Sequence, residues 1–298
     1  MTIRLGTVAP VGFAEFADPA WLGCMRELGC SSVQVYRNRI GRGGDPAKPV
    51  TTREMRDYVA AGEMPCDSLH GLYGNDLDPS NPDESARRAA VDVFKAEGDL
   101  AMELGGPLVV VHCAGIVPEG RSVSAEERAL RWSQLRKSAA ELASFGQAQG
   151  VRYALENLPP YHFVGSDTPA LRALLDELNS PRVGMCFDVA HANLVGDPIR
   201  ATAAAAGQMI YVHICDNHGR SDDHLMPFCG TIDWNAFARA LNEGRYTGVL
   251  MLEVFPALRE LRRFLDEGMK DKLAAFLRQA NGKPSPSPDA DAVSKNAV

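Results

Sequence analysis

The chain has 298 residues, of which 45% are hydrophobic and 23% charged, and its formal net charge is −7. This composition is typical of a globular protein with a large core, and the acidic balance argues against a general nucleic-acid binder, which would usually present a basic face. No stretch approaches the ~20 apolar residues that span a bilayer, and the N-terminal residues do not have the pattern of a signal peptide. The seven cysteines are scattered and form no Cys-x-x-Cys pair. We therefore expect reduced thiols in a cytoplasmic protein.

Short apolar runs alternate along the chain with segments of helical periodicity. Runs of this length, rich in Val, Ile, Leu or Met, are typical of strands buried on both faces. In chain order they are residues 3–8, 32–36, 66–70, 108–111, 151–155, 183–187, 209–214 and 249–254. Helical periodicity predicts helices at residues 51–61, 85–104, 125–149, 168–179, 197–206, 234–243 and 258–279. Ser124, Asp167 and Asp233 stand where three of these helices begin and are typical N-cap residues.

Eight strands that alternate with helices predict an α/β protein with a single (β/α)₈ barrel, a fold that typically needs ~250 residues. A doubly wound open sheet is the alternative, but it more often carries a Gly-rich phosphate-binding turn after its first strand. Here the first strand ends in "GTVAPVGF", which contains no G-x-G-x-x-G motif. We expect the barrel to occupy residues 1–280. The Pro/Ser-rich tail at residues 281–298 lacks an apolar face and is expected to be disordered.

Polar side chains end six of the predicted strands, from the third to the eighth. In a (β/α)₈ barrel these strand ends meet at the face that carries the active site. The side chains are His70, His112, Glu156, Asp188 with His191, His213 with Asp216, and Glu253. Each one alone could be a satisfied loop residue or an ion-pair partner. Together they would bury several unpaired polar groups at one point, which is costly unless a divalent metal binds them. The pattern therefore predicts a metal site.

The loop after the seventh strand, "CDNHGRSDDHL", holds further candidates. Asp216 is expected to orient a histidine or to hold a turn, rather than to bind metal. Asp222 and His224 would point to the same side of an extended segment, which suits joint metal ligation, although a solvated acidic loop explains the spacing almost as well. Cys186 and Cys215 could line the barrel, and small apolar filling of the core is the better interpretation for both.

The order and spacing of these blocks resemble the xylose isomerase-like TIM-barrel superfamily. The blocks are "SLHGLYGNDLDP", "VVVHCAG", "YALENLP", "GMCFDVAHANL", "VHICDNHGRSDDHLMPFCGTIDW" and "VLMLEVF". This superfamily contains sugar phosphate isomerase/epimerase proteins, ketose 3-epimerases, inosose-processing enzymes and endonuclease IV. The resemblance covers nearly the whole chain and implies a TIM barrel, but it is much less specific to a substrate.

The resemblance also implies residue roles. In the epimerase branch one divalent ion (Mn, Mg, Co or Zn) would be held by Glu156, Asp188, His213 and Glu253. The two glutamates would act as acid/base partners on opposite faces of the substrate, and His191 would contact a substrate oxygen. In the endonuclease IV branch a trinuclear zinc cluster has further ligands, and the matching positions are His70, His112, His191, Asp222 and His224.

Other residues are candidates for substrate binding. Tyr73 follows His70, and the endonuclease IV branch places a DNA-contacting loop there. His218 and Arg220 lie in the loop after the seventh strand, although Arg220 is offset from the arginine of the ketose epimerases. The basic stretch "RNRIGRGG", residues 37–44, is the only such cluster on a strand-end loop and could bind a phosphate, a carboxylate or a DNA backbone. A small polyhydroxylated or phosphorylated substrate is favoured over nucleic acid. A homo-oligomer is compatible with such a barrel, but no sequence feature indicates one.

The leading hypothesis is a metal-dependent isomerase or epimerase of a keto sugar, sugar phosphate or cyclitol that works through an enediolate. A dehydratase acting on a cyclic ketone such as an inosose would share the first step. An endonuclease IV-like zinc phosphodiesterase is the alternative from another reaction class. A barrel that keeps a metal only for stability is the third hypothesis.

Overall fold

The computed structural model describes residues 2–11, 19–37 and 50–283, which form a closed barrel of eight parallel strands. Each strand pairs with the next one along the chain, and the last strand pairs with the first. The strands are β1 (Arg4–Val11), β2 (Cys30–Arg37), β3 (Cys66–His70), β4 (Leu108–His112), β5 (Arg152–Glu156), β6 (Val183–Asp188), β7 (Met209–Ile214) and β8 (Val249–Leu252). The predicted (β/α)₈ barrel is confirmed, and the alternative of an open sheet is wrong.

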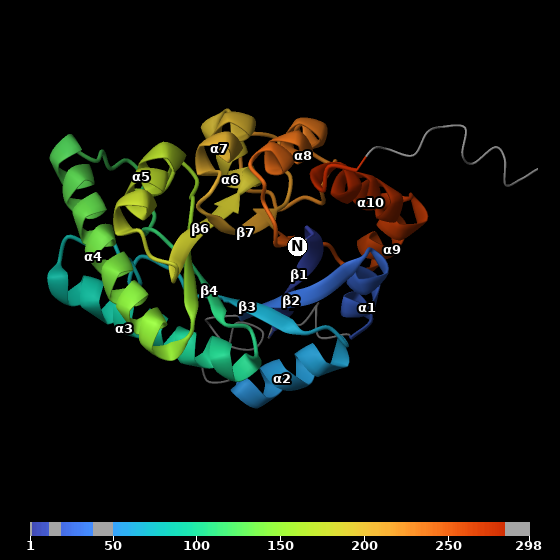
Figure 1. The fold of residues 1–298 in the computed structure, drawn as a ribbon, viewed down its shortest axis with the longest axis horizontal. Helices are drawn as coiled ribbons and strands as arrows, with labels where there is room; N and C mark the ends of the chain where they lie inside the picture. The colour runs from blue at the N-terminus through green and yellow to red at the C-terminus, as the bar shows by residue number, and fades with distance from the viewer. Residues whose placement is uncertain (1, 12–18, 38–49, 284–298) are drawn as a thin grey trace, which may run out of the picture.

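Helices surround the barrel, with α3 and α4 side by side on one flank and α1, α9 and α10 on the other (Figure 1). The helices are α1 (Pro19–Glu27), α2 (Thr52–Ala61), α3 (Glu84–Leu104), α4 (Ala125–Gln149), α5 (Thr168–Leu178), α6 (Val189–Val195), α7 (Pro198–Ala205), α8 (Trp234–Glu243), α9 (Leu258–Asp266) and α10 (Met269–Ala280). Among the described residues, none of these helices is long and apolar enough to cross a membrane.

The predicted helices match the structure closely, with three differences. The sequence did not predict α1, nor the short helix α6, whose seven residues directly follow β6. The single helix expected over residues 258–279 is two helices, because Gly268 adopts a left-handed backbone with φ 79° between α9 and α10. The tail beyond residue 283 and all but the first residue of the basic stretch 37–44 lie outside the described residues.

The expected N-caps are confirmed. The side chains of Ser124, Asp167 and Asp233 accept hydrogen bonds from the backbone N–H groups at the third positions of α4, α5 and α8. Such caps satisfy backbone donors that a helix leaves unpaired at its start. Near the C-terminal end of the described residues, the Asn281 side chain accepts from Ile3 N at 2.8 Å and donates to Ile3 O at 3.1 Å, which fixes the end of α10 to the residue before β1.

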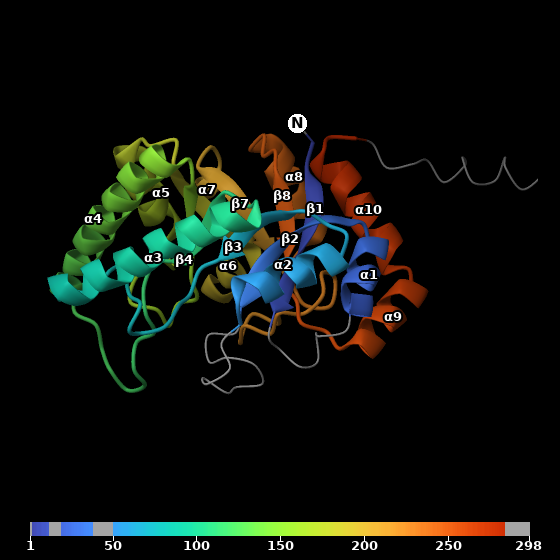
Figure 2. The ribbon, with the colours of Figure 1, turned by 90° about the horizontal axis from the view of Figure 1, so that it is seen from below.

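The strand register brings the polar residues to one end of the barrel. His112 pairs with Glu156 across β4 and β5, and Asp188 pairs with His213 across β6 and β7. Because all strands run parallel, their carboxyl ends lie on the same face. In Figure 2 the connection from β4 to α4, drawn in green, projects beyond the start of α4. This connection forms part of the wall of the site described below.

Candidate metal centre and its cavity

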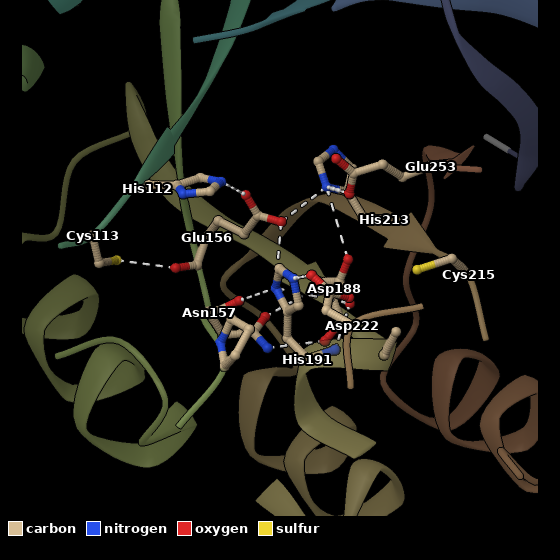
Figure 3. A network of polar contacts seen from close by, with 12 residues as sticks. His112, Cys113, Glu156, Asn157, Asp188, His191, His213, Cys215, Asp222 and Glu253 are labelled. Carbon is tan, nitrogen blue, oxygen red and sulfur yellow. Dashed lines mark hydrogen bonds and ion pairs between the residues drawn. The ribbon is translucent and has the colours of Figure 1, made fainter. Parts of the chain in front are cut away.

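Four side chains from adjacent strands converge at the carboxyl end of the barrel. His213 Nδ1 lies 3.0 Å from Glu156 Oε1, 2.9 Å from Glu253 Oε2 and 4.0 Å from Asp188 Oδ2. One ligand atom from each of the four residues lies within 4.8 Å of those of the others. Figure 3 shows their side chains pointing toward a common point. We call Glu156, Asp188, His213 and Glu253 the metal quartet.

The metal quartet is buried and incompletely paired. Glu156, Asp188 and His213 are 0% exposed and Glu253 is 4% exposed. Among the described residues, Asp188 Oδ2 and His213 Nε2 have no hydrogen-bond partner, and Glu156 Oε2 and Glu253 Oε2 meet only histidine nitrogens, at 3.3 and 2.9 Å. Three buried carboxylates around one imidazole are strongly unfavourable unless a cation compensates their charge. Mixed carboxylate and imidazole donors suit a divalent ion, so the residues fit a metal.

Three further histidines present their Nε2 atoms to the same cavity. His70, His191 and His224 each place Nδ1 next to a backbone carbonyl oxygen, those of Gly71 at 2.9 Å, Asn157 at 2.8 Å and Glu253 at 2.9 Å. A carbonyl only accepts, so Nδ1 carries the hydrogen and Nε2 of the neutral ring is left as a metal donor. This arrangement is typical of metal-binding histidines.

The Nε2 atoms of these histidines face carboxylates. His70 Nε2 lies 3.8 Å from Glu156 Oε2 and 3.7 Å from Glu253 Oε1. The Nε2 atoms of His191 and His224 lie 3.2 and 3.4 Å from Asp222 Oδ2. His112 Nε2 lies 3.3 Å from Glu156 Oε2. The structure therefore brings together all nine residues for which the sequence predicted a metal-binding role.

Burial and nearby charge together shift the pKa values of the histidines in opposite directions. Burial lowers the pKa of His70 to about 4, so its ring is neutral. Burial would also lower the pKa of His191, but the charges of Asp188 and Asp222 outweigh it and raise the pKa to about 10. For His224 the hydrogen bond to Asp222 outweighs burial in the same way, and its pKa rises to about 10. Protons on His191 and His224 thus compensate carboxylate charge where a metal ion would otherwise do so.

A cavity of about 130 Å³ opens next to the metal quartet. Its lining comes from the ends of seven strands, β2 to β8, and the connections that follow them, and it combines polar with aromatic or apolar groups. The lining residues are Tyr36, His70, Tyr73, His112, Ile116, Pro159, Tyr161, His162, His191, Asp222, His224 and Glu253. Sequence reasoning missed Tyr36, Ile116, Pro159, Tyr161 and His162. Apart from Tyr36, which lies near the end of β2, they lie in loops, where no strand periodicity marks them.

The loop after β7 differs from expectation in part. His218 and Arg220 are exposed and line a separate surface hollow with Asp223 and Thr231, so the structure does not bring them to the cavity. Asp222 and His224 face the same point, as expected, but the segment is not extended, because His224 has φ 46°. Asp222 and His224 thus point to the same side because of a left-handed backbone at His224, and not because the segment is an extended strand.

Asp216 and the two cysteines lie close to the site without lining the cavity. Asp216 accepts from Asn217 N at 2.9 Å, Ile232 N at 3.3 Å and Trp234 Nε1 at 2.8 Å, so it holds the loop, and the expected turn-holding role is confirmed. Cys186 and Cys215 are fully buried, as expected of core filling. The Cys215 Sγ nevertheless lies 3.7 Å from His224 Nδ1.

Asn157 links two strands of the site and was not singled out from the sequence. Its side chain donates to Asp188 O at 2.9 Å and accepts from Asp188 N at 2.7 Å, while its carbonyl oxygen accepts from His191 Nδ1.

We expect Asn157→Ala to weaken binding of Mn²⁺ about 10- to 100-fold, measured by isothermal titration calorimetry, because residues that hydrogen-bond to metal ligands orient those ligands. Asn193→Ala, which loses bonds only to Asn217 and Thr231, is the matched control. Equal affinities in both variants would contradict this role.

His162 gives a pH-dependent prediction. It is 7% exposed, and burial, followed by the nearby His112, lowers its pKa to about 3. The unfolded chain therefore binds a proton near pH 6.5 that the folded chain does not, so this histidine reduces stability as pH falls between 6.5 and 3. As pH falls over this range, we expect the free energy of unfolding to decrease less in His162→Gln than in the wild type. The slopes of unfolding free energy against pH should differ by up to about 1.4 kcal/mol per pH unit. Urea unfolding at pH 7, 6 and 5 measures it, and parallel curves would contradict it.

Comparisons with known proteins support the architecture. MJ1311 of Methanocaldococcus jannaschii, described only as an uncharacterized protein, is 30% identical over 184 residues, which are 60% of this chain and 61% of MJ1311. The match thus spans about three fifths of that relative's length. Fructoselysine 3-epimerase of Escherichia coli O157:H7 is 25% identical over 235 residues, or 76% of this chain and 82% of the epimerase.

A solved structure and a family description extend the comparison. The structure of an L-ribulose 3-epimerase matches with a TM-score of 0.72 at 19% identity, covering 100% of both chains, which is a likeness of fold. Residues 24–278 match the family described as "Xylose isomerase-like TIM barrel". Because this match covers most of the 298 residues, the chain belongs to the xylose isomerase-like TIM barrel family.

Proposed function

We propose that this protein is a divalent-metal-dependent isomerase or epimerase of a keto sugar, sugar phosphate or cyclitol. The observation that carries the proposal is the metal quartet, in which Glu156 at the end of β5 and Glu253 directly after β8 approach His213 Nδ1 next to a cavity. Two carboxylates that flank one binding position can remove a proton from one face of a carbon and return it on the other. The fructoselysine and L-ribulose epimerases among the similar proteins support the same reaction class.

The metal quartet would hold the ion, whether Mn²⁺, Mg²⁺, Co²⁺ or Zn²⁺. A bound ion would act as a Lewis acid toward the carbonyl and adjacent hydroxyl oxygens of the substrate. Glu156 or Glu253 would then take the proton from the carbon next to the carbonyl, giving an enediolate, and the other glutamate would supply the proton on the opposite face. His191, which lines the cavity with Nδ1 fixed by Asn157 O, would contact a substrate oxygen. A dehydratase acting on a cyclic ketone would share the first of these steps.

A second candidate function is an endonuclease IV-like zinc phosphodiesterase. The observation that favours it is that further ligand atoms converge beside the metal quartet. His70 and His112 form one group with Glu156, and the Nε2 atoms of His191 and His224 meet Asp222. These groups could hold a second and a third zinc ion, as a phosphodiesterase that clamps a phosphate would need.

Proton exchange with solvent tests the proposal. The protein, supplied with Mn²⁺, Mg²⁺, Co²⁺ or Zn²⁺, is incubated in D₂O with a panel of ketoses, sugar phosphates and inososes. We expect deuterium at the carbon next to the carbonyl of at least one compound, detected by NMR, together with its epimer or isomer. Absence of exchange across the panel, with cleavage of an abasic DNA duplex, would reject the isomerase and support the phosphodiesterase.

The proposal extends to partners and location. The partner is a small polyhydroxylated or phosphorylated molecule, since the cavity of about 130 Å³ combines imidazoles and carboxylates with aromatic rings. A cytoplasmic location is proposed from the reduced cysteines, which form no disulfide among the described residues. A homo-oligomer remains compatible with the barrel and is tested by sedimentation.

A further inference from the structure

The cavity beside the metal quartet is lined by two unlike groups of residues. His191, Asp222, His224 and Glu253 form a polar side that continues into the metal quartet. The lining also includes Tyr73, Ile116 and Tyr161, which we call the apolar rim. A polyhydroxylated molecule that binds the metal would satisfy the polar side. It would not by itself explain the apolar rim.

The apolar rim is exposed as well as apolar. Tyr73, Ile116 and Tyr161 are 41%, 47% and 43% exposed, and they are three of the six large hydrophobic residues that are exposed among the described part of the chain. Single exposed hydrophobic residues are ordinary, but a group of them at the edge of a cavity is typical of a ligand-binding surface.

Two loops fix the apolar rim in place. Val117 N donates to Tyr161 O at 2.9 Å and Phe163 N donates to Gly115 O at 3.1 Å, so the β4–α4 and β5–α5 connections pair as short antiparallel segments. Ile116 N donates to Asn75 Oδ1 at 2.7 Å, which joins the loop that carries Tyr73. The exposed side chains therefore stand on paired backbone and are not tips of an isolated loop.

A buried ion pair supports these loops from behind. Arg131 of α4 is 5% exposed, and its Nη1 donates to Asp78 Oδ2 at 2.7 Å. The Arg131 guanidinium also lies over the Phe163 ring, with Cζ 3.4 Å from the ring centroid. Arg128 adds a hydrogen bond to Phe163 O at 3.1 Å. A buried pair of this kind is costly to break, so the wall is preorganised before any ligand binds.

Aromatic rings connect the apolar rim to the metal side. The Tyr73 ring stacks on His112 with centroids 4.6 Å apart, and the Tyr161 ring lies against His162 with centroids 4.9 Å apart. His112 in turn lies 3.3 Å from Glu156. The apolar rim and Glu253 of the metal quartet therefore line the same cavity, so one ligand can contact both.

We propose that the substrate is a conjugated keto sugar, whose sugar part enters the polar side of the cavity and whose apolar or aromatic substituent rests on Tyr73, Ile116 and Tyr161. This inference rests on the proposed function for the sugar part, and it adds the class of substituent. Burial of the substituent removes apolar surface from water on both partners, which favours the conjugate over the free sugar.

Matched ligands test the substituent. The probes are the 1-O-methyl, 1-O-benzyl, 6-O-methyl and 6-O-benzyl ethers of D-fructose and D-tagatose, titrated calorimetrically into the full chain with Mn²⁺. We expect a benzyl ether to bind about tenfold more tightly than the methyl ether at the same position in at least one pair. Equal affinities within every pair, or no binding by any of the probes, would overturn the inference.

Variants locate the substituent. Ile116→Ser and Tyr161→Ser are expected to bring the benzyl-to-methyl affinity ratio close to one, with unchanged circular dichroism. Leu130→Ser is the matched control, because Leu130 is also 47% exposed but does not line the cavity. A benzyl preference that survives both rim variants would overturn the inference.

Two further measurements separate the possible outcomes. Deuterium exchange tests the proposed function independently of the apolar subsite, and sedimentation velocity tests whether the apolar rim is a dimer interface. A benzyl preference without deuterium exchange in D₂O would reject the proposed function and keep the apolar subsite. Deuterium exchange without a benzyl preference would keep the proposed function and reject the apolar subsite. A dimer in sedimentation velocity that Ile116→Ser dissociates and Leu130→Ser does not would show that a second copy of this chain covers the apolar rim, and would overturn the inference.

Discussion

Glu156→Gln and Glu253→Gln are each expected to lower kcat for epimerisation about 10²- to 10⁴-fold while the substrate still binds. The physical reason is that glutamine keeps an oxygen and the shape of the side chain but cannot accept the proton. Stopped-flow or NMR turnover assays give kcat, and calorimetry gives the dissociation constant. Because each glutamate is proposed to serve a different face of the substrate, neither is expected to replace the other.

Deuterium exchange makes this prediction sharper. If the two glutamates serve opposite faces of the substrate, each variant keeps one glutamate. That glutamate should still exchange the hydrogen of the epimer in which this hydrogen lies on its side of the carbon. The two variants should therefore exchange different epimers. Glu97→Gln, which alters a buried glutamate of α3 that is 3% exposed, is the control for loss of a buried carboxylate. Full turnover in either site variant, or loss of exchange from the same epimer in both, would exclude the proposed pair.

Most of the barrel could be predicted from the sequence because each strand is buried on both faces and shows as a short apolar run. The strands differ from expectation only at their ends, as for β1, which continues to Val11 instead of residue 8. Helix α6 could not be predicted, since its seven residues directly follow Asp188, which is both the last residue of β6 and the N-cap of the helix. The break at Gly268 was hidden because helical periodicity continues on both sides of it.

The candidate site also has residues that could be predicted from the sequence and residues that could not. The metal quartet was predictable because strand ends of a barrel must meet, so the sequence position of a residue such as Glu156 gives its place in space. Asn157 directly follows β5, but its side-chain bonds to the Asp188 backbone leave no pattern in the sequence. His162 lies in a loop that pairs with Ile116 of another loop, and this contact leaves no periodic pattern either. The displacement of His218 and Arg220 away from the cavity has the same origin, a turn whose path only tertiary contacts fix.

Divalent ions are expected to stabilise the folded protein through the metal quartet. At an ion concentration a hundredfold above the dissociation constant, the free energy of unfolding should rise by about 2.7 kcal/mol relative to the chelator-treated protein. The gain arises because the ion compensates three carboxylates that are at most 4% exposed. Urea unfolding with EDTA or with Mn²⁺ measures it.

Asp188→Asn separates metal binding from ordinary packing. Asp188 Oδ1 accepts from His191 N at 2.7 Å as the N-cap of α6, and asparagine can keep that bond while losing the charge. The variant should therefore fold as well as the chelator-treated wild type or better, because one buried negative charge is removed, yet gain little stability from Mn²⁺. Asp167→Asn alters the N-cap of α5, outside the metal quartet, and should keep the full gain. Equal gains in both variants would mean that the ion binds elsewhere. A large loss of stability in metal-free Asp188→Asn would mean that the carboxylate serves the fold and not the ion.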